Sequence, residues 1–233
     1  MDMTSAVERQ ALLTERLKEA GACLVGYGDV SVVKSETADK FPVALSIAVK
    51  YDDAIIDNLH VDEEAFHRHQ LEIRASMDSI IDIAADLLRG WGYAYELPQT
   101  KIINSNEELA QLKTFPYKIA ATCAGLGWIG KSDLLVTSEY GPRVRLAAIL
   151  TDAPFKTAEP AKESRCGDCR ACVHACPNQA IKGAQWQRGT PREDLLDAYV
   201  CNQKRLDYIS SIGRKYACGH CMRVCPVGRK KEV

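Results

Sequence analysis

The sequence predicts an α/β region over residues 1–155, followed by a small cysteine-rich region over residues 156–233. Two observations predict this division. Helix-like and strand-like patterns alternate along the first part, and eight of the ten cysteines lie between residues 166 and 225. The segment 151–164 has two prolines and several small polar residues, which are typical of a connection between two parts.

The α/β region begins with short strands. Residues 22–28 and 42–51 are apolar runs bounded by Gly, Asp and Pro, so they predict strands, and residues 92–98 predict a third. Apolar residues then recur at steps of three and four, which predicts an amphipathic helix that ends at Gly90 and Gly92. We expect this stripe to face the core, and it consists of Ile73, Met77, Ile80, Ile81, Ala84, Leu87 and Leu88.

A glycine-rich stretch, "AGLGWIGKS" at 124–132, matches two phosphate-binding patterns at once. Read from Gly125, it satisfies both G-x-G-x-x-G and G-x-x-x-x-G-K-[ST]. Both patterns need a strand before the glycines and a helix after them, because the helix N-terminus faces the phosphates. Here residues 116–124 predict a short helix, and the apolar runs at 134–137 and 146–150 predict two strands that pair with each other. The context therefore predicts no nucleotide site.

The strongest signal is the cysteine spacing. Residues 166–177 read C-x2-C-x2-C-x3-C-P, the run typical of bacterial iron–sulfur proteins in which the fourth cysteine serves the other cluster of a pair. We expect a short helix to follow it. Residues 218–226 repeat the pattern without its first cysteine, because Lys215 stands in that place.

Cys201 would supply the missing thiolate. We expect it near the far end of a helix that starts with a capping box at Thr190 and Glu193, with Pro191 at the first helical position. The spacing thus predicts two 4Fe–4S clusters. One is held by Cys166, Cys169, Cys172 and Cys225, and the other by Cys176, Cys201, Cys218 and Cys221.

The alternative interpretation is a pair of zinc sites, since C-x2-C is also a zinc spacing; the proline-ended four-cysteine run favours clusters. His174 and His220 lie inside the cysteine loops and are expected to be surface or supporting groups rather than ligands. Cys23 and Cys123 are expected to be small buried apolar residues.

Composition limits the partners and the compartment. Thirty basic and thirty-one acidic side chains give a net charge of −1, which indicates no general attraction to nucleic acid or anionic lipid. The N-terminus lacks the pattern of a signal peptide, and no apolar run reaches the length of a membrane span. We therefore expect a cytoplasmic protein with reduced cysteines and no membrane contact.

The order of these motifs over about residues 60–227 resembles the epoxyqueuosine reductases and, more remotely, the reductive dehalogenases. The resemblance is carried by "FHRHQLEIRASMDSIIDIAADLL", "GLGWIGK", "LTD" and the cysteine runs. It implies an α/β (α+β) nitroreductase-like, cobalamin-binding domain over 1–155 and a bacterial-type two-cluster ferredoxin domain over 156–233. It also implies that the corrinoid is lined by Gly125, Gly127, Trp128, Gly130 and Lys131.

Three departures from the family pattern shape the expected activity. Residues 96–123 contain no aspartate, where the family has its proton donor. The family's Y-G-S is replaced by "YGPRVRL", which adds Arg143 and Arg145. The chain ends on "VGRKKEV", so we expect the family's C-terminal extension and tRNA-binding surface to be missing and epoxyqueuosine not to be the substrate.

The leading hypothesis is an iron–sulfur oxidoreductase in which two clusters pass electrons to cobalamin and then to a small-molecule substrate. Its donor would be a low-potential ferredoxin or flavodoxin, and its protons would come from Lys131, Tyr140 or a glutamate. One alternative is a non-catalytic electron-transfer or corrinoid-carrying protein that reduces a partner, possible partners including a corrinoid protein. Another is a flavin protein, because nitroreductase-like folds bind FMN.

Overall fold

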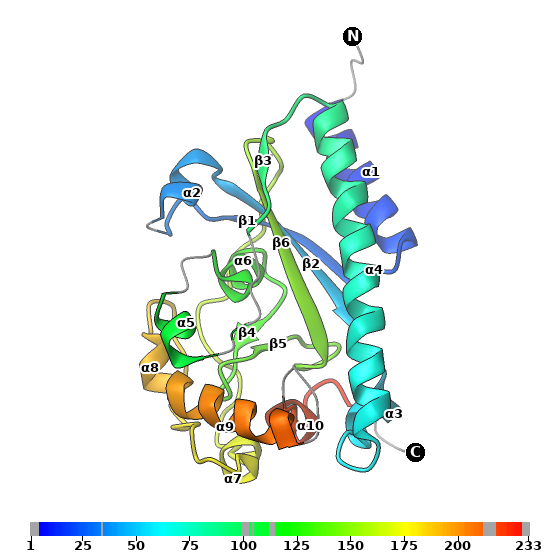
Figure 1. Cartoon of the computed structure of the whole chain (residues 1–233). Coiled ribbons are helices and arrows are strands. Elements are labelled where there is room, and N and C mark those ends of the chain that lie inside the picture. Colours follow the sequence, from blue (N-terminus) through cyan, green and yellow to red (C-terminus); the bar gives the residue numbers. More distant parts are fainter. Residues whose placement is uncertain are drawn as a thin grey trace.

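A four-stranded antiparallel sheet forms the centre of the α/β region (Figure 1). Its strands, in the order in which they are hydrogen-bonded, are β1 (Leu24–Asp29), β2 (Val43–Lys50), β6 (Val144–Thr151) and β3 (Tyr95–Glu96). The structure is a computed structural model. It describes residues 5–33, 35–98, 103, 105–111, 115–211 and 218–229, without the side chains of residues 204 and 208–211.

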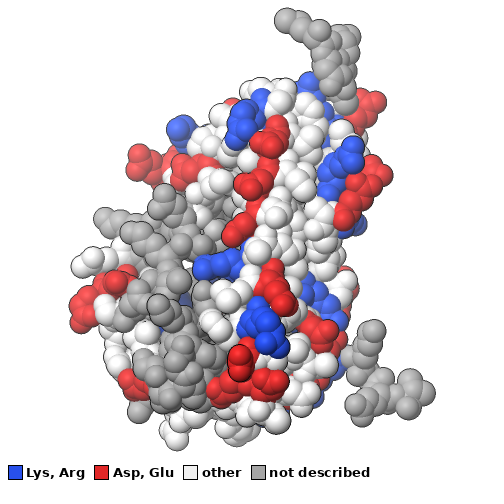
Figure 2. Space-filling view, turned by 45° about the vertical axis from the view of Figure 1, so that its right-hand side comes forward, with Lys and Arg blue, Asp and Glu red and all other residues white. Residues whose placement is uncertain are grey.

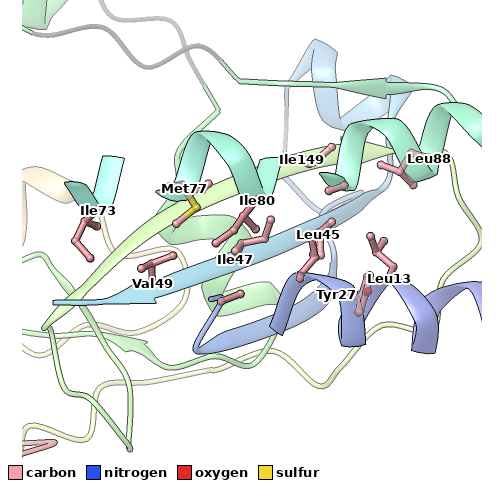
Figure 3. Packing of buried hydrophobic residues seen from close by; sticks show 14 of the residues in the cluster. Leu13, Tyr27, Leu45, Ile47, Val49, Ile73, Met77, Ile80, Leu88 and Ile149 are labelled. Atoms are coloured by element: carbon pink, nitrogen blue, oxygen red, sulfur yellow. The ribbon is translucent and has the colours of Figure 1, made fainter. Parts of the chain in front are cut away.

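Helices cover both faces of this sheet. One face carries α1 (Ala6–Glu19) and the long α4 (Glu63–Gly90), and the other carries α6 (Tyr117–Cys123), as Figure 1 shows. Strand β2 is therefore buried along nearly its whole length. Its alternate residues Leu45 and Ile47 pack toward α1 and α4 (Figure 3). Ala44 packs against Ala120 and Cys123 of α6 on the other face.

Helix α4 confirms the predicted amphipathic stripe. Asp62 caps its first turn, since the Asp62 carboxylate accepts a hydrogen bond from the Ala65 N–H. Of the seven stripe residues, Ile81 and Leu87 are partly buried against the core, and the others are buried: Ile73, Met77, Ile80, Ala84 and Leu88 (Figure 3). The shorter helices of this region are α2 (Glu36–Lys40), α3 (Asp53–Asp57) and α5 (Asn106–Ala110).

The glycine-rich stretch lies in a hairpin and not before a helix. It leads from α6 into β4 (Trp128–Ile129), which pairs with β5 (Leu135–Val136). The expected pairing between the strand after the motif and the strand at 146–150 was wrong, because β6 pairs with β2 and β3 instead. The chain reverses at Gly141, which has a φ of 55° and forms a bridge to Thr137, and this turn carries β6 into the main sheet.

The described residues of the cysteine-rich region form the helices α7 (Ala171–Ala175), α8 (Arg192–Leu195), α9 (Ala198–Ser211) and α10 (His220–Arg223). The single helix expected from Thr190 to Cys201 was wrong. The Thr190 hydroxyl accepts a hydrogen bond from the Gln187 N–H instead of capping a helix, and the backbone is extended at Leu196. Cys201 therefore lies in the first turn of α9. The short helix expected after Pro177 was also wrong, because residues 178–191 form no helix.

One apolar cluster contains residues of both parts of the chain, and we call it the shared apolar cluster. It joins Trp128, Ile129 and Leu135 of the hairpin to residues of the cysteine-rich region such as Trp186 and Leu195. A division of the chain at residue 155 stays a prediction. In the parts of the chain that are described, no helix combines the length and the apolar character that crossing a membrane requires.

Candidate cluster-binding centre

Four cysteines from distant segments form the first group of thiols. The pKa of Cys172 is raised to about 11, first by burial and then by the nearby Cys166, Cys225 and Cys169. The pKa of Cys225 is raised in the same way, by burial and then by Cys166 and Cys169. We call these four residues, Cys166, Cys169, Cys172 and Cys225, the outer set.

The other four cysteines form a second group. Burial raises the pKa of Cys201, with further contributions from Cys218 and Cys176. Burial also raises the pKa of Cys221, whose neighbours are the same three thiols and Cys172. We call Cys176, Cys201, Cys218 and Cys221 the inner set. Cys172 and Cys221 are thus the point at which the two sets adjoin.

The membership of the two groups is the one that the sequence spacing predicts, and the ligation itself stays a prediction. The donor chemistry fits two clusters, because each set offers the four thiols that a 4Fe–4S cluster needs as ligands. Among the residues that the structure describes, no three His, Cys, Asp or Glu side chains are placed to hold a single metal ion.

The remaining cysteines, Cys23 and Cys123, lie outside the two sets, and His174 and His220 lie inside the cysteine loops. Cys123 is buried and accepts a hydrogen bond of 3.2 Å from the Arg188 guanidinium, and Cys23 is half-buried. Neither is an electrostatic neighbour of the two sets. His174 is exposed, and the ring of His220 stacks on that of His60 at 3.9 Å between centroids.

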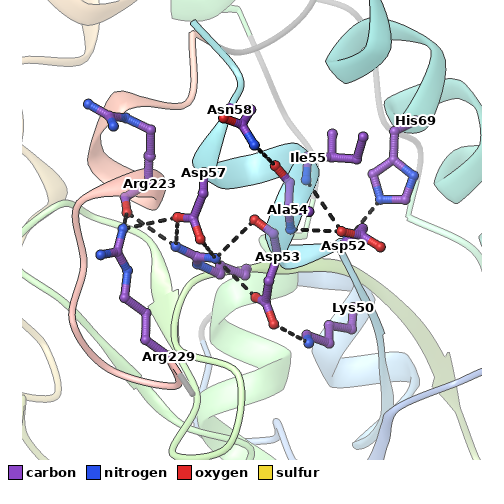
Figure 4. A network of polar contacts seen from close by, with 11 residues as sticks. Lys50, Asp52, Asp53, Ala54, Ile55, Asp57, Asn58, His69, Arg223 and Arg229 are labelled. Atoms are coloured by element: carbon purple, nitrogen blue, oxygen red, sulfur yellow. Dashed lines mark hydrogen bonds and ion pairs between the residues drawn. The ribbon is translucent and has the colours of Figure 1, made fainter. Parts of the chain in front are cut away.

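A buried arginine connects the outer set to the α/β region. Arg143, at the turn before β6, has no exposed surface, and its guanidinium donates to Asp53 Oδ1 at 3.0 Å and to Asp57 Oδ1 at 2.6 Å. It also donates to the carbonyl of Arg223 at 3.3 Å, the last residue of α10, which lies between Cys221 and Cys225 in the sequence. Figure 4 shows Asp57 and Asp53 of α3 around this guanidinium, with Arg229 as a second donor to Asp57.

Two glycines near Arg143, Gly141 and Gly228, leave no room for a side chain. A Cβ on Gly141 would overlap the carbonyl of Val227, and a Cβ on Gly228 would overlap the backbone of Tyr140 and Gly141. The turn before β6 and the segment after Cys225 are therefore packed backbone against backbone. Together with Arg143, this packing fixes the outer set against α3 and β6.

Lys131 connects the glycine-rich stretch to the cysteine loop. Its side chain is 5 % exposed, and its ammonium donates to the carbonyls of Gly167 at 2.7 Å and Cys169 at 3.0 Å. These contacts favour a positioning role for Lys131 over the proton donation suggested by the sequence. Tyr140, the other candidate, is half-buried, with its ring 5.7 Å from the ammonium of Lys50.

The glycines of this stretch serve the hairpin itself. A Cβ on Gly127 would overlap the carbonyl of Val136, and one on Gly130 would lie 2.8 Å from the Val136 side chain. Trp128 is buried in the shared apolar cluster. Gly125, Gly127 and Trp128 border an open cleft of about 450 Å³ whose other wall is the segment 159–165. The hairpin thus accounts for the glycines at 127 and 130, and a corrinoid lined by Gly125, Gly127, Trp128, Gly130 and Lys131 stays a prediction.

A second ion network lies beside the inner set. Asp133, which follows the glycine-rich stretch, has a φ of 59° and is buried. Its carboxylate is 2.6 Å from the Lys118 ammonium and 2.8 Å from Arg192 Nε. Arg192 is also a favourable electrostatic neighbour of the Cys201 thiol. Burial lowers the pKa of Lys118, while the Asp133 carboxylate opposes that shift.

Sequence reasoning missed both ion networks. Arg143 was noted only as a departure from a family pattern, and Asp133 was not singled out. The partners of Arg143 lie 86 and 90 residues away, so no local spacing reveals them. The sequence held one indication of this role for Arg143. It is a basic residue directly before the apolar run that forms a central strand.

Comparison with protein families identifies the second region. Residues 165–228 match the family model for a 4Fe-4S double cluster binding domain. The chain is 36% identical over 112 residues to an epoxyqueuosine reductase of Listeria monocytogenes, a match that takes in 46% of this chain and 28% of that protein. It is 30% identical over 156 residues to an epoxyqueuosine reductase of Bacillus subtilis, which covers 65% of this chain and 37% of the relative. The matches thus span well under two thirds of the relatives' length.

Solved structures show the same fold over nearly the whole chain. A catabolic reductive dehalogenase superposes with a TM-score of 0.72 at 18% identity, over 100% of this chain and 33% of that one. The epoxyqueuosine reductase of Bacillus subtilis superposes with a TM-score of 0.60 at 18% identity, over 98% of this chain and 68% of that one. These likenesses confirm the predicted α/β fold followed by a two-cluster domain.

Proposed function

Because the chain is a distant homologue of epoxyqueuosine reductases over part of its length, we propose that it is an iron–sulfur oxidoreductase. In this proposal electrons from a low-potential carrier pass through two 4Fe–4S clusters toward a bound corrinoid. The observation that carries it is the grouping of eight thiols into two adjoining sets on a domain of the double-cluster type.

The roles of the chain's own residues follow from their contacts. The outer and inner sets would hold the two clusters, which supply one-electron transfer when bound. Lys131 fixes the loop that carries Cys169, and Arg143 fixes the end of α10, between Cys221 and Cys225. The shared apolar cluster, which contacts Cys166, Cys172 and Cys201, keeps water from one side of the sets and so tunes their potentials.

The corrinoid part of the proposal is supported by the relatives. One solved reductive dehalogenase, which superposes with a TM-score of 0.70 at 18% identity, is described as suggesting a mechanism for B12-dependent dehalogenation. No described residue is assigned here as a corrinoid contact or as the proton donor. A corrinoid would supply a reducible cobalt centre.

A non-catalytic electron carrier that reduces a partner protein is the second candidate. It is favoured by one feature of the sequence, the absence of aspartate between residues 96 and 123, where the resembled family has its proton donor. In this alternative the two cysteine sets keep the same role, and only the final acceptor differs.

Cofactor analysis tests the proposal. The protein is produced anaerobically with cobalamin supplied, and iron, cobalt and flavin are then measured with the visible spectrum. We expect about eight iron and about one cobalt per chain. A yellow protein with flavin and no cobalt would contradict the corrinoid part. Turnover of a small epoxide or organohalide by the cobalt-loaded protein separates an enzyme from a carrier.

A further inference from the structure

A half-buried arginine lies one helical turn after Cys201. Arg205 follows Cys201 by four residues on α9, and this spacing places both side chains on the same face of the helix. Burial lowers the pKa of Arg205, and the nearby Cys201 and Cys218 oppose that shift. The guanidinium of Arg205 therefore lies beside two thiols of the inner set.

This guanidinium is held by uncharged acceptors. It donates to the carbonyl of Ile103 at 2.5 Å and to Asn202 Oδ1 at 2.8 Å. The side chain of Asn202 is buried, and its amide donates to Asn106 Oδ1 at 2.9 Å, in α5. These hydrogen bonds connect α9 to α5 and fix the orientation of Arg205.

In the part of the chain that the structure describes, Arg205 has no carboxylate partner. Two other arginines beside the sets differ in this respect, because Arg143 pairs with two aspartates and Arg192 pairs with one. On the face of the molecule that carries α4, Lys and Arg are interspersed with Asp and Glu (Figure 2). The positive charge of Arg205 is thus not compensated by a described acidic side chain.

An uncompensated cation favours the reduced form of a nearby iron–sulfur cluster. Reduction adds one negative charge to a group that its thiolate ligands already make anionic, and the surrounding charge is one determinant of its potential. Cys201 and Cys221 pack against the shared apolar cluster, where a low effective dielectric constant strengthens this interaction. Arginine stays protonated in proteins, so the charge is constant with pH.

We infer that Arg205 raises the reduction potential of the cluster held by the inner set. This inference rests on the two clusters of the proposed function and assigns a residue that regulates one of them. Reduction transfers one electron to this cluster from the low-potential carrier, which is oxidised by one electron, and no bond forms or breaks. The charge of Arg205 makes this transfer more favourable than it would be beside a neutral side chain.

Redox titration of the iron-loaded full chain, followed by electron paramagnetic resonance, tests this role. Arg205→Gln removes the charge and keeps a hydrogen-bond donor. We expect the equilibrium constant for reduction of the inner cluster to fall about tenfold, which is a potential about 59 mV lower for one electron. The outer cluster, whose signal is identified in Cys201→Ser, should shift less.

Three further variants separate charge from structure. Arg205→Lys keeps the charge and should keep the parent's potential. Asn202→Asp gives Arg205 a carboxylate partner at the position of the present amide oxygen, so it should also lower the potential, and it replaces Arg205→Gln if that variant loses iron. The control Arg89→Gln removes an exposed arginine that pairs with Asp86 on α4 and should leave both potentials unchanged.

The parent's potential in iron-replete Arg205→Gln or Asn202→Asp, or an equal fall in Arg205→Lys, would overturn the role of Arg205 and leave the proposed function intact. The titration needs the clusters and no corrinoid, so absence of cobalt would contradict only the corrinoid part of the proposed function. A protein without iron–sulfur clusters would refute both.

Discussion

The α/β region and the cysteine-rich region are stabilised in different ways. In the first, helices on both faces of the sheet bury large apolar side chains completely, such as Leu45, Ile47 and Ile80. In the described part of 166–229, the buried apolar side chains are only Ala180, Ile181, Trp186, Leu195 and Leu196. We therefore expect apolar burial to suffice for the sheet, and the cysteine-rich region to depend on its clusters and on ion pairs such as Arg192–Asp133 and Arg229–Asp57.

Removal of the clusters should separate the two regions most strongly. Iron-free protein should keep slow amide exchange in β2, β6 and α4, because their apolar core contains no metal ligand. Residues 166–211 and 218–229 should exchange rapidly, since a small metal-binding domain loses its folding free energy with the metal. Hydrogen exchange with mass spectrometry measures this, and uniform protection in both regions would contradict the comparison.

Loss of one thiolate of the inner set should remove one of the two clusters. Cys201→Ser should lower the iron content from about eight to about four per chain, because only the inner set contains Cys201. The control is Cys23→Ser, which lies outside both sets and should keep all the iron. An unchanged iron content in Cys201→Ser would show that the division into sets is incorrect.

Arg143→Met should weaken the connection between the regions. It removes the bonds to Asp53, Asp57 and the Arg223 carbonyl, and we expect a loss of about 2–4 kcal/mol of unfolding free energy, with the outer cluster lost first. Denaturant titration and iron analysis measure the two effects. The matched control is Arg145→Met, two residues further along the chain, in β6. Equal losses in the two variants would refute a specific role for Arg143.

Asp133→Asn should have a smaller effect, centred on the inner set. Asparagine tolerates the positive φ of this position, so the change removes mainly the charge that pairs with Lys118 and Arg192. We expect a loss of about 1–3 kcal/mol, measured by denaturant titration. Adding Lys118→Met should restore part of it, because the unpaired buried ammonium is removed; purely additive losses would exclude coupling.

The smallest effect concerns pH and belongs to the α/β region alone. Burial raises the pKa of Cys23 from 9.0 to about 11. Above pH 9 the Cys23 thiol ionises more readily in the unfolded chain than in the folded protein, which favours unfolding. The contribution of the buried thiol to stability is therefore complete below pH 9 and is lost as the pH rises toward about 11. Cys23→Ala should therefore lose less stability over this window than the parent, by less than about 3 kcal/mol. Parallel stability curves would contradict the assignment.

The sequence predicts features that depend on local spacing. The stripe of α4 and the two cysteine runs follow from helical period and ligand geometry, and both lie where they were expected. Pairings set by distant residues were not predictable in this way. The pairing of β4 with β5, the break at Leu196 and the partners of Arg143 depend on tertiary contacts. The glycines at 127 and 130 were attributed to a cofactor because a tight hairpin and a ligand both require them.

Iron and acid-labile sulfide analysis of anaerobically isolated protein tests the central claim most directly. Eight thiols in two adjoining sets predict a brown protein with about eight iron and about eight sulfide per chain. A colourless protein that contains zinc and no sulfide would contradict this account.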